Sequence, residues 1–120
     1  VINAPTFDPS SQVAPYHAGD DLPVSWTPTQ NGKVQVNMIN ARSGVITQLS
    51  CTWDGSAGSA TIPGATIDLL GGDAGGYDTG FYVLTDTTVN PSGWTITETL
   101  QTRAYAPGKT DFAGGTLELD

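Results

Sequence analysis

The chain has very little of the side chains that carry most enzyme and nucleic-acid chemistry. Its 120 residues include one cysteine, one histidine, one methionine and four lysine and arginine residues. One cysteine excludes a disulfide within the chain, and four scattered cations exclude the clustered basic surface that nucleic acids require. No apolar run approaches the roughly 18 residues of a membrane helix. The sequence therefore predicts no nucleic-acid partner and no direct membrane insertion.

The charge that is present is acidic, with twelve aspartate and glutamate residues and a formal net charge of −8. Such a surface favours solubility and could suit calcium, which prefers oxygen ligands. The chain opens at Val1 without an initiator methionine or a signal peptide. We therefore expect a processed product or a fragment of a longer protein. The composition favours a location outside the cell, at the cell surface or in the periplasm.

Alternation of apolar and polar residues with a period of two dominates the chain. Leu22, Val24 and Trp26 share one face of a short segment, and the same pattern recurs over residues 33–40 and 45–53. This alternation is typical of a sheet with one buried and one solvated face. Trp26 ends such a segment, so we expect it in the core.

Turn-forming residues separate these segments and set the fold class. Asn31-Gly32, Ser43-Gly44 and Asp54-Gly55 tolerate the positive φ angles of tight turns. Further strands are expected over 2–7, 59–62, 80–86, 94–105 and 116–119, with a helical turn at 68–70. The strands over 80–86 and 94–105 are expected to pair as a hairpin across Asn90-Pro91-Ser92-Gly93. The spacing predicts one domain over residues 1–120, an all-β, seven- to eight-stranded antiparallel Greek-key β-sandwich of the immunoglobulin-like type.

Three segments carry a resemblance to a known family. Gly19–Trp26 resembles the second strand of immunoglobulin-like and fibronectin type III-like β-sandwich domains in bacterial surface proteins and lipoproteins. Ser59–Ile62 resembles their short fifth strand and Gly80–Leu84 their sixth. The chain departs from antibody-type domains because it lacks the paired cysteines. The resemblance implies a spacer, adhesive or accessory module and supplies no catalytic residues.

Aromatic side chains form the first candidate site. Trp53, Trp94, Tyr16 and Tyr77 lie near turns or in loops with polar neighbours, where exposed rings could stack on sugars as in carbohydrate-binding modules. Ordinary packing is the other interpretation of the same residues, and the more frequent one. A polysaccharide partner is therefore an alternative.

Aspartates form the second candidate site. Asp68, Asp73 and Asp78 fall in or beside a glycine-rich stretch, and loop carboxylates with backbone carbonyls are what calcium requires. No EF-hand or other calcium-binding repeat accompanies them, so solvated turn aspartates are the simpler interpretation. Apart from this calcium hypothesis the sequence predicts no cofactor.

Catalytic combinations are missing from the sequence. The single His17 lies in a loop, Cys51 is best interpreted as a small buried apolar residue, and no nucleophile motif surrounds either. Glu98 shares a strand face with Ile96 and Leu100, where an edge position accounts for a carboxylate. We therefore expect no enzyme.

The leading hypothesis is a non-catalytic extracellular or cell-surface module that acts as a spacer or interaction domain. Its partners would be neighbouring domains or proteins at the cell surface. The further alternative is self-association, in which this chain is a subunit of an extracellular fibre. The proline-bearing segment from Ile2 to Phe7 would then complete a neighbouring subunit by strand addition.

Overall fold

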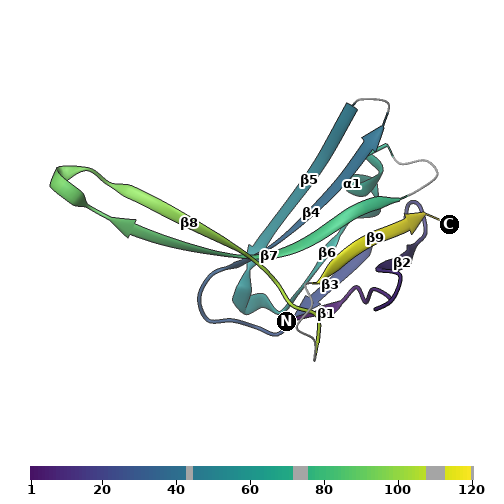
Figure 1. The fold of residues 1–120 in the computed structure, drawn as a ribbon, viewed down its shortest axis with the longest axis horizontal. Coiled ribbons are helices and arrows are strands. Elements are labelled where there is room, and N and C mark those ends of the chain that lie inside the picture. The colour runs from purple at the N-terminus through teal and green to yellow at the C-terminus, as the bar shows by residue number, and fades with distance from the viewer. Residues whose placement is uncertain (43–44, 72–75, 108–112, 120) are drawn as a thin grey trace.

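The computed structural model describes residues 1–42, 45–71, 76–107 and 113–119, and within these ranges it contains nine strands and three short helices (Figure 1). The strands are β1 (Ile2–Ala4), β2 (Val13–Tyr16), β3 (Leu22–Trp26), β4 (Lys33–Arg42), β5 (Val45–Asp54), β6 (Ser59–Ile62), β7 (Tyr77–Val89), β8 (Ile96–Arg103) and β9 (Gly114–Leu119). The helices are α1 (Gly64–Asp68) and the 3-10 turns η1 (Gly55–Ala57) and η2 (Pro91–Gly93).

The smaller sheet has three strands in the order β1-β3-β6. The central strand β3 pairs antiparallel with both neighbours, with Ile2 opposite Trp26 and Leu22 opposite Ile62. Leu22, Val24 and Trp26 are buried, as the alternation predicts, and the intervening Pro23 is exposed.

The larger sheet has the order β2-β9-β7-β4-β5, and β8 pairs with β7 outside that path. β4 is paired along its whole length with β5 and through Lys33–Ile39 with β7. Its inward side chains Val34, Val36 and Met38 are almost fully buried. The expected β7–β8 hairpin across residues 90–93 is confirmed.

One apolar core lies between the two sheets, which makes the chain an all-β sandwich. The small sheet contributes Ile2, Leu22, Val24, Trp26 and Ile62, and the large sheet contributes Val34, Val36, Met38, Phe81 and Leu117. Ile67 within α1 and Leu70, two residues beyond its end, are also buried. The prediction that Trp26 lies in the core is confirmed.

Several details differ from the sequence-based expectation. β2 was not predicted, and it pairs with β9 in parallel, so the structure is not purely antiparallel. Pro15 lies inside β2, where the missing N–H restricts a strand to a sheet border, which explains why the pattern did not suggest a strand there. The first strand ends at Ala4 rather than at Phe7, and the helix begins at Gly64 rather than near Asp68.

The helix begins where it does because the backbones of two segments approach closely. A Cβ at Gly64 would collide with the carbonyl group of Gly19, so only glycine fits. The Gly64 N–H donates a hydrogen bond of 2.8 Å to Asp21 Oδ1. Asn40 Nδ2 donates another of 2.8 Å to the Leu70 carbonyl, which ties the end of this segment to the large sheet.

The distal half of the β7–β8 hairpin, which carries the turn, projects from the sandwich, to the left in Figure 1. β4 stops pairing with β7 at Leu84, and beyond that point β7 and β8 pair only with each other among the described residues. We call residues 85–102 the arm. The radius of gyration is 15.8 Å, whereas a compact chain of this length has about 14 Å.

Matched leucine substitutions separate core from arm. Leu117 is fully buried and Leu100 on the arm is 63 % exposed. We expect Leu117→Ala to lower the free energy of unfolding by about 2–5 kcal/mol, because it removes packed methyl groups and leaves a cavity. Leu100→Ala should change it by less than about 0.5 kcal/mol. Urea denaturation followed by tryptophan fluorescence measures both, and equal effects would contradict the assigned core.

Candidate functional site

The arm is the most exposed part of the described chain. Every residue from Thr85 to Arg103 is exposed. These residues include the large apolar side chains Val89, Trp94, Ile96 and Leu100, which are 39 %, 74 %, 43 % and 63 % exposed. Large apolar side chains that are exposed next to one another often mark an interaction surface.

The register of the arm sorts its side chains onto two faces. Val83 packs against the core, and alternation places Thr85, Thr87 and Val89 on the same side. Their cross-strand partners are Leu100, Glu98 and Ile96. The core-side face of the arm therefore continues the inner face of the large sheet, but no part of the small sheet covers it. The opposite face carries Thr97, Thr99 and Gln101 on β8.

A polar groove of about 350 Å³ lies on the outer face of the large sheet, at the foot of the arm. Four strands and the loop before β2 line it: Asn37 and Ile39 on β4, Asp78, Thr79, Gly80 and Tyr82 on β7, Arg103 on β8, Gly115 and Thr116 on β9, and Ser11 and Gln12 in the loop. A Cβ at position 80 would lie 3.0 Å from the Tyr82 hydroxyl oxygen. The glycine therefore allows the half-buried Tyr82 ring to lie against the sheet.

Side-chain hydrogen bonds order the polar residues around this groove. Ser50 Oγ donates to Asn37 Oδ1 at 2.7 Å. Gln101 Nε2 donates to Gln35 Oε1 at 2.9 Å, which joins the foot of the arm to β4. The resulting surface combines amides, a carboxylate, a guanidinium and one aromatic ring, a chemistry that suits a polyhydroxylated ligand.

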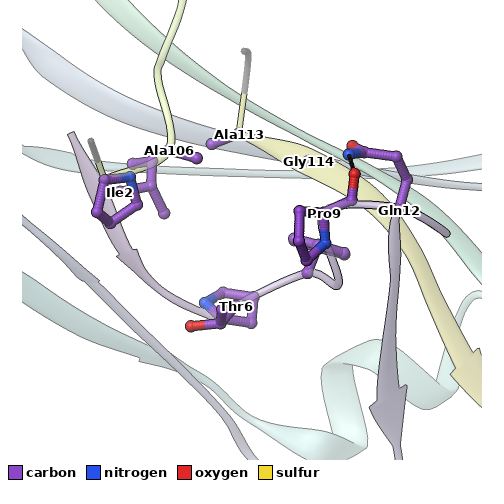
Figure 2. A pocket seen from close by; sticks show the side chains of 10 residues that line it. Ile2, Thr6, Pro9, Gln12, Ala106, Ala113 and Gly114 are labelled. Carbon is purple, nitrogen blue, oxygen red and sulfur yellow. Dashed lines mark hydrogen bonds between the residues drawn. The ribbon is translucent and has the colours of Figure 1, made fainter. Parts of the chain in front are cut away.

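A second hollow, of about 280 Å³, is largely apolar (Figure 2). Its lining residues are Ile2, Pro5, Thr6, Phe7, Pro9, Gln12, Ala106, Pro107, Ala113 and Gly114. Gln12 Nε2 donates a hydrogen bond of 3.4 Å to the Pro9 carbonyl across its rim. Pro107 and Ala113 border residues 108–112, which lie outside the described residues, so we assign no ligand to this pocket.

The rim of this pocket is shaped by a turn at Asp8. Asp8 Oδ1 accepts hydrogen bonds from the backbone N–H and the hydroxyl of both Ser10 and Ser11, at 2.7–3.0 Å. These donors, the Ser10 hydroxyl foremost, hold the pKa of the Asp8 carboxyl well below its usual range. The turn is therefore fixed by an exposed carboxylate that stays ionised in acid.

The predicted carbohydrate-binding aromatics do not form one site. Tyr16 and Tyr77 are buried, 5 % and 2 % exposed, and their rings meet edge to face with centroids 6.4 Å apart. Both rings lie on inward positions of sheet strands, as in the ordinary-packing interpretation, so neither presents a face to a sugar. Trp53 is half-buried and stacks on Trp26, and only Trp94, beside η2 on the arm, stands free in solvent.

Tyr16 instead has a structural role. Its hydroxyl donates a hydrogen bond of 2.6 Å to the Asp20 carbonyl, which closes the loop between β2 and β3. Burial raises the pKa of Tyr16 to about 12, and the nearby carboxylate of Asp68 adds to the effect. The phenol is therefore neutral at any physiological pH.

The predicted calcium ligands are also separate in the described structure. Asp68 ends α1 and Asp78 lies on the outer face of β7, while Asp73 lies outside the described residues. In residues 1–42, 45–71, 76–107 and 113–119, no group of three or more His, Cys, Asp or Glu side chains is placed to hold a metal ion.

The remaining predicted residues are placed as follows. Ile2 is buried in β1 and pairs within its own chain, and Phe7 lies 6.2 Å from Phe81, centroid to centroid. His17 is exposed in the loop before β3. Cys51 is half-buried on β5, and burial raises the pKa of its thiol. Tyr82 and Arg103 were not among the predicted site residues, because both fall inside expected strands, 80–86 and 94–105, with no motif around them.

Comparison of the chain with protein-family models, with curated proteins and with solved structures finds no match. None of the helices in the described residues is both long enough and apolar enough to cross a membrane.

Alkaline titration tests the burial of Tyr16. Because the folded pKa is raised from 10.0 to about 12, the neutral phenol stabilises the fold fully below pH 10. This stability should be lost as the pH rises through about 12. The ultraviolet difference titration between the native chain and Tyr16→Phe should show one phenol ionising near pH 12. A difference step near pH 10 would show that the ring is solvated.

Proposed function

We propose that this chain is a non-catalytic, immunoglobulin-like module of a secreted or cell-surface bacterial protein, and that it binds a protein partner through its projecting arm. The observation that carries the proposal is the complete exposure of residues 85–103, apolar side chains included. The core does not use these residues.

The strand order supports the immunoglobulin-like assignment. In that architecture, strands A, B and E form one sheet and strands G, F and C the other, and the variable type adds C′ beside C. The order β1-β3-β6 matches the first set, and β9-β7-β4-β5 matches the second. The chain departs from the pattern where β2 joins the larger sheet in parallel and where β5 leads through η1 directly to β6.

The low stability and the exposed apolar surface of the arm favour a binding role over a role as a spacer alone. A two-stranded hairpin without a tertiary face to pack on is marginally stable in water. The arm also exposes apolar side chains that raise the risk of aggregation. A spacer needs neither feature, whereas a binding arm gains stability from the partner that covers it.

A polysaccharide is the second candidate ligand, and the polar groove at the foot of the arm favours it. Tyr82 offers a ring face, and Asn37, Asp78 and Arg103 surround it with donors and acceptors. This second candidate uses residues other than the four aromatics that the sequence suggested.

Shortening the arm tests whether it serves binding or folding. Thr85 and Leu100 are directly opposite each other, so an Asn-Gly turn in place of residues 86–99 closes the hairpin at that rung. We expect the thermal midpoint of this variant to stay within about 3 °C of the native chain, because the removed residues make no core contact. A larger fall would show that the arm belongs to the fold and would overturn the proposal.

Light scattering with calcium and then with chelator tests assembly. We expect a monomer of 12.4 kDa under both conditions, since β1 is paired within its own chain. A polymer would instead favour the fibre hypothesis, and a calcium-dependent mass would favour a metal-linked interface. The shortened-arm variant is the control that shows whether any association uses the arm.

Substitutions at two aromatic residues test the polysaccharide candidate. On a panel of neutral polysaccharides examined by affinity electrophoresis, Tyr82→Ala should weaken binding about tenfold, which corresponds to about 1.4 kcal/mol. Trp94→Ala should leave it unchanged, because that ring lies on the arm and outside the groove. A panel without any retarded migration would remove this candidate.

A further inference from the structure

The borders of the two sheets are unequally protected. Exposed strand edges attract other strands, and proteins usually shorten them or interrupt them with proline. β1 has three residues and is followed by Pro5, β2 contains Pro15, and β6 has four residues and is followed by Pro63. These three strands are therefore poor templates for a further strand.

Two complete border strands lack this protection, namely β5 with ten residues and β8 with eight, and neither contains proline or lysine. On the arm β7 also has an open edge beyond Leu84, but that edge spans only residues 85–89 and carries a single apolar side chain, Val89. β5 and β8 differ in burial. The inward side chains of β5, among them Leu49 and Cys51, are half-buried and packed against the core. All eight residues of β8 are exposed, and the edge of β8 away from β7 has no strand partner within the described residues. β8 is therefore the more accessible template.

The core-side face of β8 presents a specific sequence of side chains. Ile96, Glu98 and Leu100 follow one another at alternate positions, so two apolar groups flank one carboxylate. The other face carries Thr97, Thr99 and Gln101, which are uncharged. A strand that pairs with this edge would place every second side chain opposite this apolar, acidic, apolar series.

The charge of the arm selects among partners. Residues 85–102 contain Asp86 and Glu98 and no lysine or arginine, in a chain of net charge −8. The one cation on β8 is its last residue, Arg103, at the foot of the arm. A second copy would bring acidic groups to an acidic arm, which disfavours self-association. A basic partner would gain both long-range attraction and a cross-strand pair with Glu98.

We infer that the free edge of β8 accepts an extended strand from a basic partner protein, and that this strand alternates apolar, basic and apolar side chains opposite Ile96, Glu98 and Leu100. Main-chain hydrogen bonds to β8 supply the affinity, and the alternate side chains supply the specificity. The added strand also widens the arm from two strands to three, the number at which a sheet becomes independently stable. The inference rests on the proposed function of the arm as the binding element.

The test uses the whole chain and two synthetic peptides. One peptide is Thr-Val-Thr-Lys-Thr-Val-Thr, and the other has glutamate in place of lysine. Nitrogen-15 NMR titrations measure the dissociation constant of each and the amides that shift. We expect the lysine peptide to bind at least about fivefold more tightly than the glutamate peptide, with the largest shifts at 96–103.

Matched charge reversals give the control. Glu98→Lys should invert the preference between the two peptides, whereas Glu118→Lys, the same exchange at an exposed position of the internal strand β9, should leave it unchanged. Equal effects of the two variants would mean that net charge alone attracts the peptide, and this would overturn the inference. So would shifts that map to β5 or to the groove, equal affinity for both peptides, no binding of either peptide, or an arm-dependent dimer in light scattering.

The outcomes separate this inference from the proposed function. If the peptides fail while the shortened-arm variant keeps its thermal midpoint, the strand-binding mode is wrong and the arm stays a binding element. If the shortened variant loses its stability, the proposed function itself is wrong.

Discussion

The contact on which the rest of the structure depends is the stack of Trp26 on Trp53, whose ring centroids lie 5.9 Å apart at an interplanar angle of 26°. Trp26 ends β3 in the small sheet, and Trp53 lies near the end of β5 in the large sheet. The buried Trp26 indole N–H also donates a hydrogen bond of 2.8 Å to the Gly55 carbonyl, in the turn through which the chain changes sheets. One side chain thus fixes the spacing of the sheets and the crossing between them.

The unequal width of the sheets follows from this arrangement and determines what stays exposed. Three strands face five, so the small sheet can bury the inward side chains of β4 but only half-covers those of β5. The β7–β8 hairpin continues beyond both sheets, and no described residue of the small sheet covers its core-side face. An apolar face that would be core within the sandwich therefore becomes surface on the arm.

The two candidate surfaces share β7 and β8 but use opposite faces of the large sheet. The polar groove lies on the outer face and the apolar series of the arm on the inner one. Gln101 joins them physically, because it lies on the arm and hydrogen-bonds to Gln35 beside the groove. Chemically they differ: one is a hollow lined by amides and a phenol, and the other is a strand edge flanked by apolar groups.

The candidate site was only partly predictable from the sequence. Alternation correctly placed Glu98, Ile96 and Leu100 on one strand face and suggested an edge position for the carboxylate. It could not tell that Tyr16 and Tyr77 are buried. That outcome depends on β2 lying beside β9, about a hundred residues further along the chain. Short strands with an internal proline carry too little local signal to reveal such a pairing.

The sequence by itself determined the all-β class, the strands β3, β4 and β5, the turn between β7 and β8, and the burial of Trp26. These features depend on side-chain alternation and turn residues that lie within a few positions of one another. Only the tertiary structure decided which faces are covered, because burial depends on how far the opposing sheet reaches. The same alternating pattern is core at Phe81 and open surface at Leu100, and nothing local distinguishes the two.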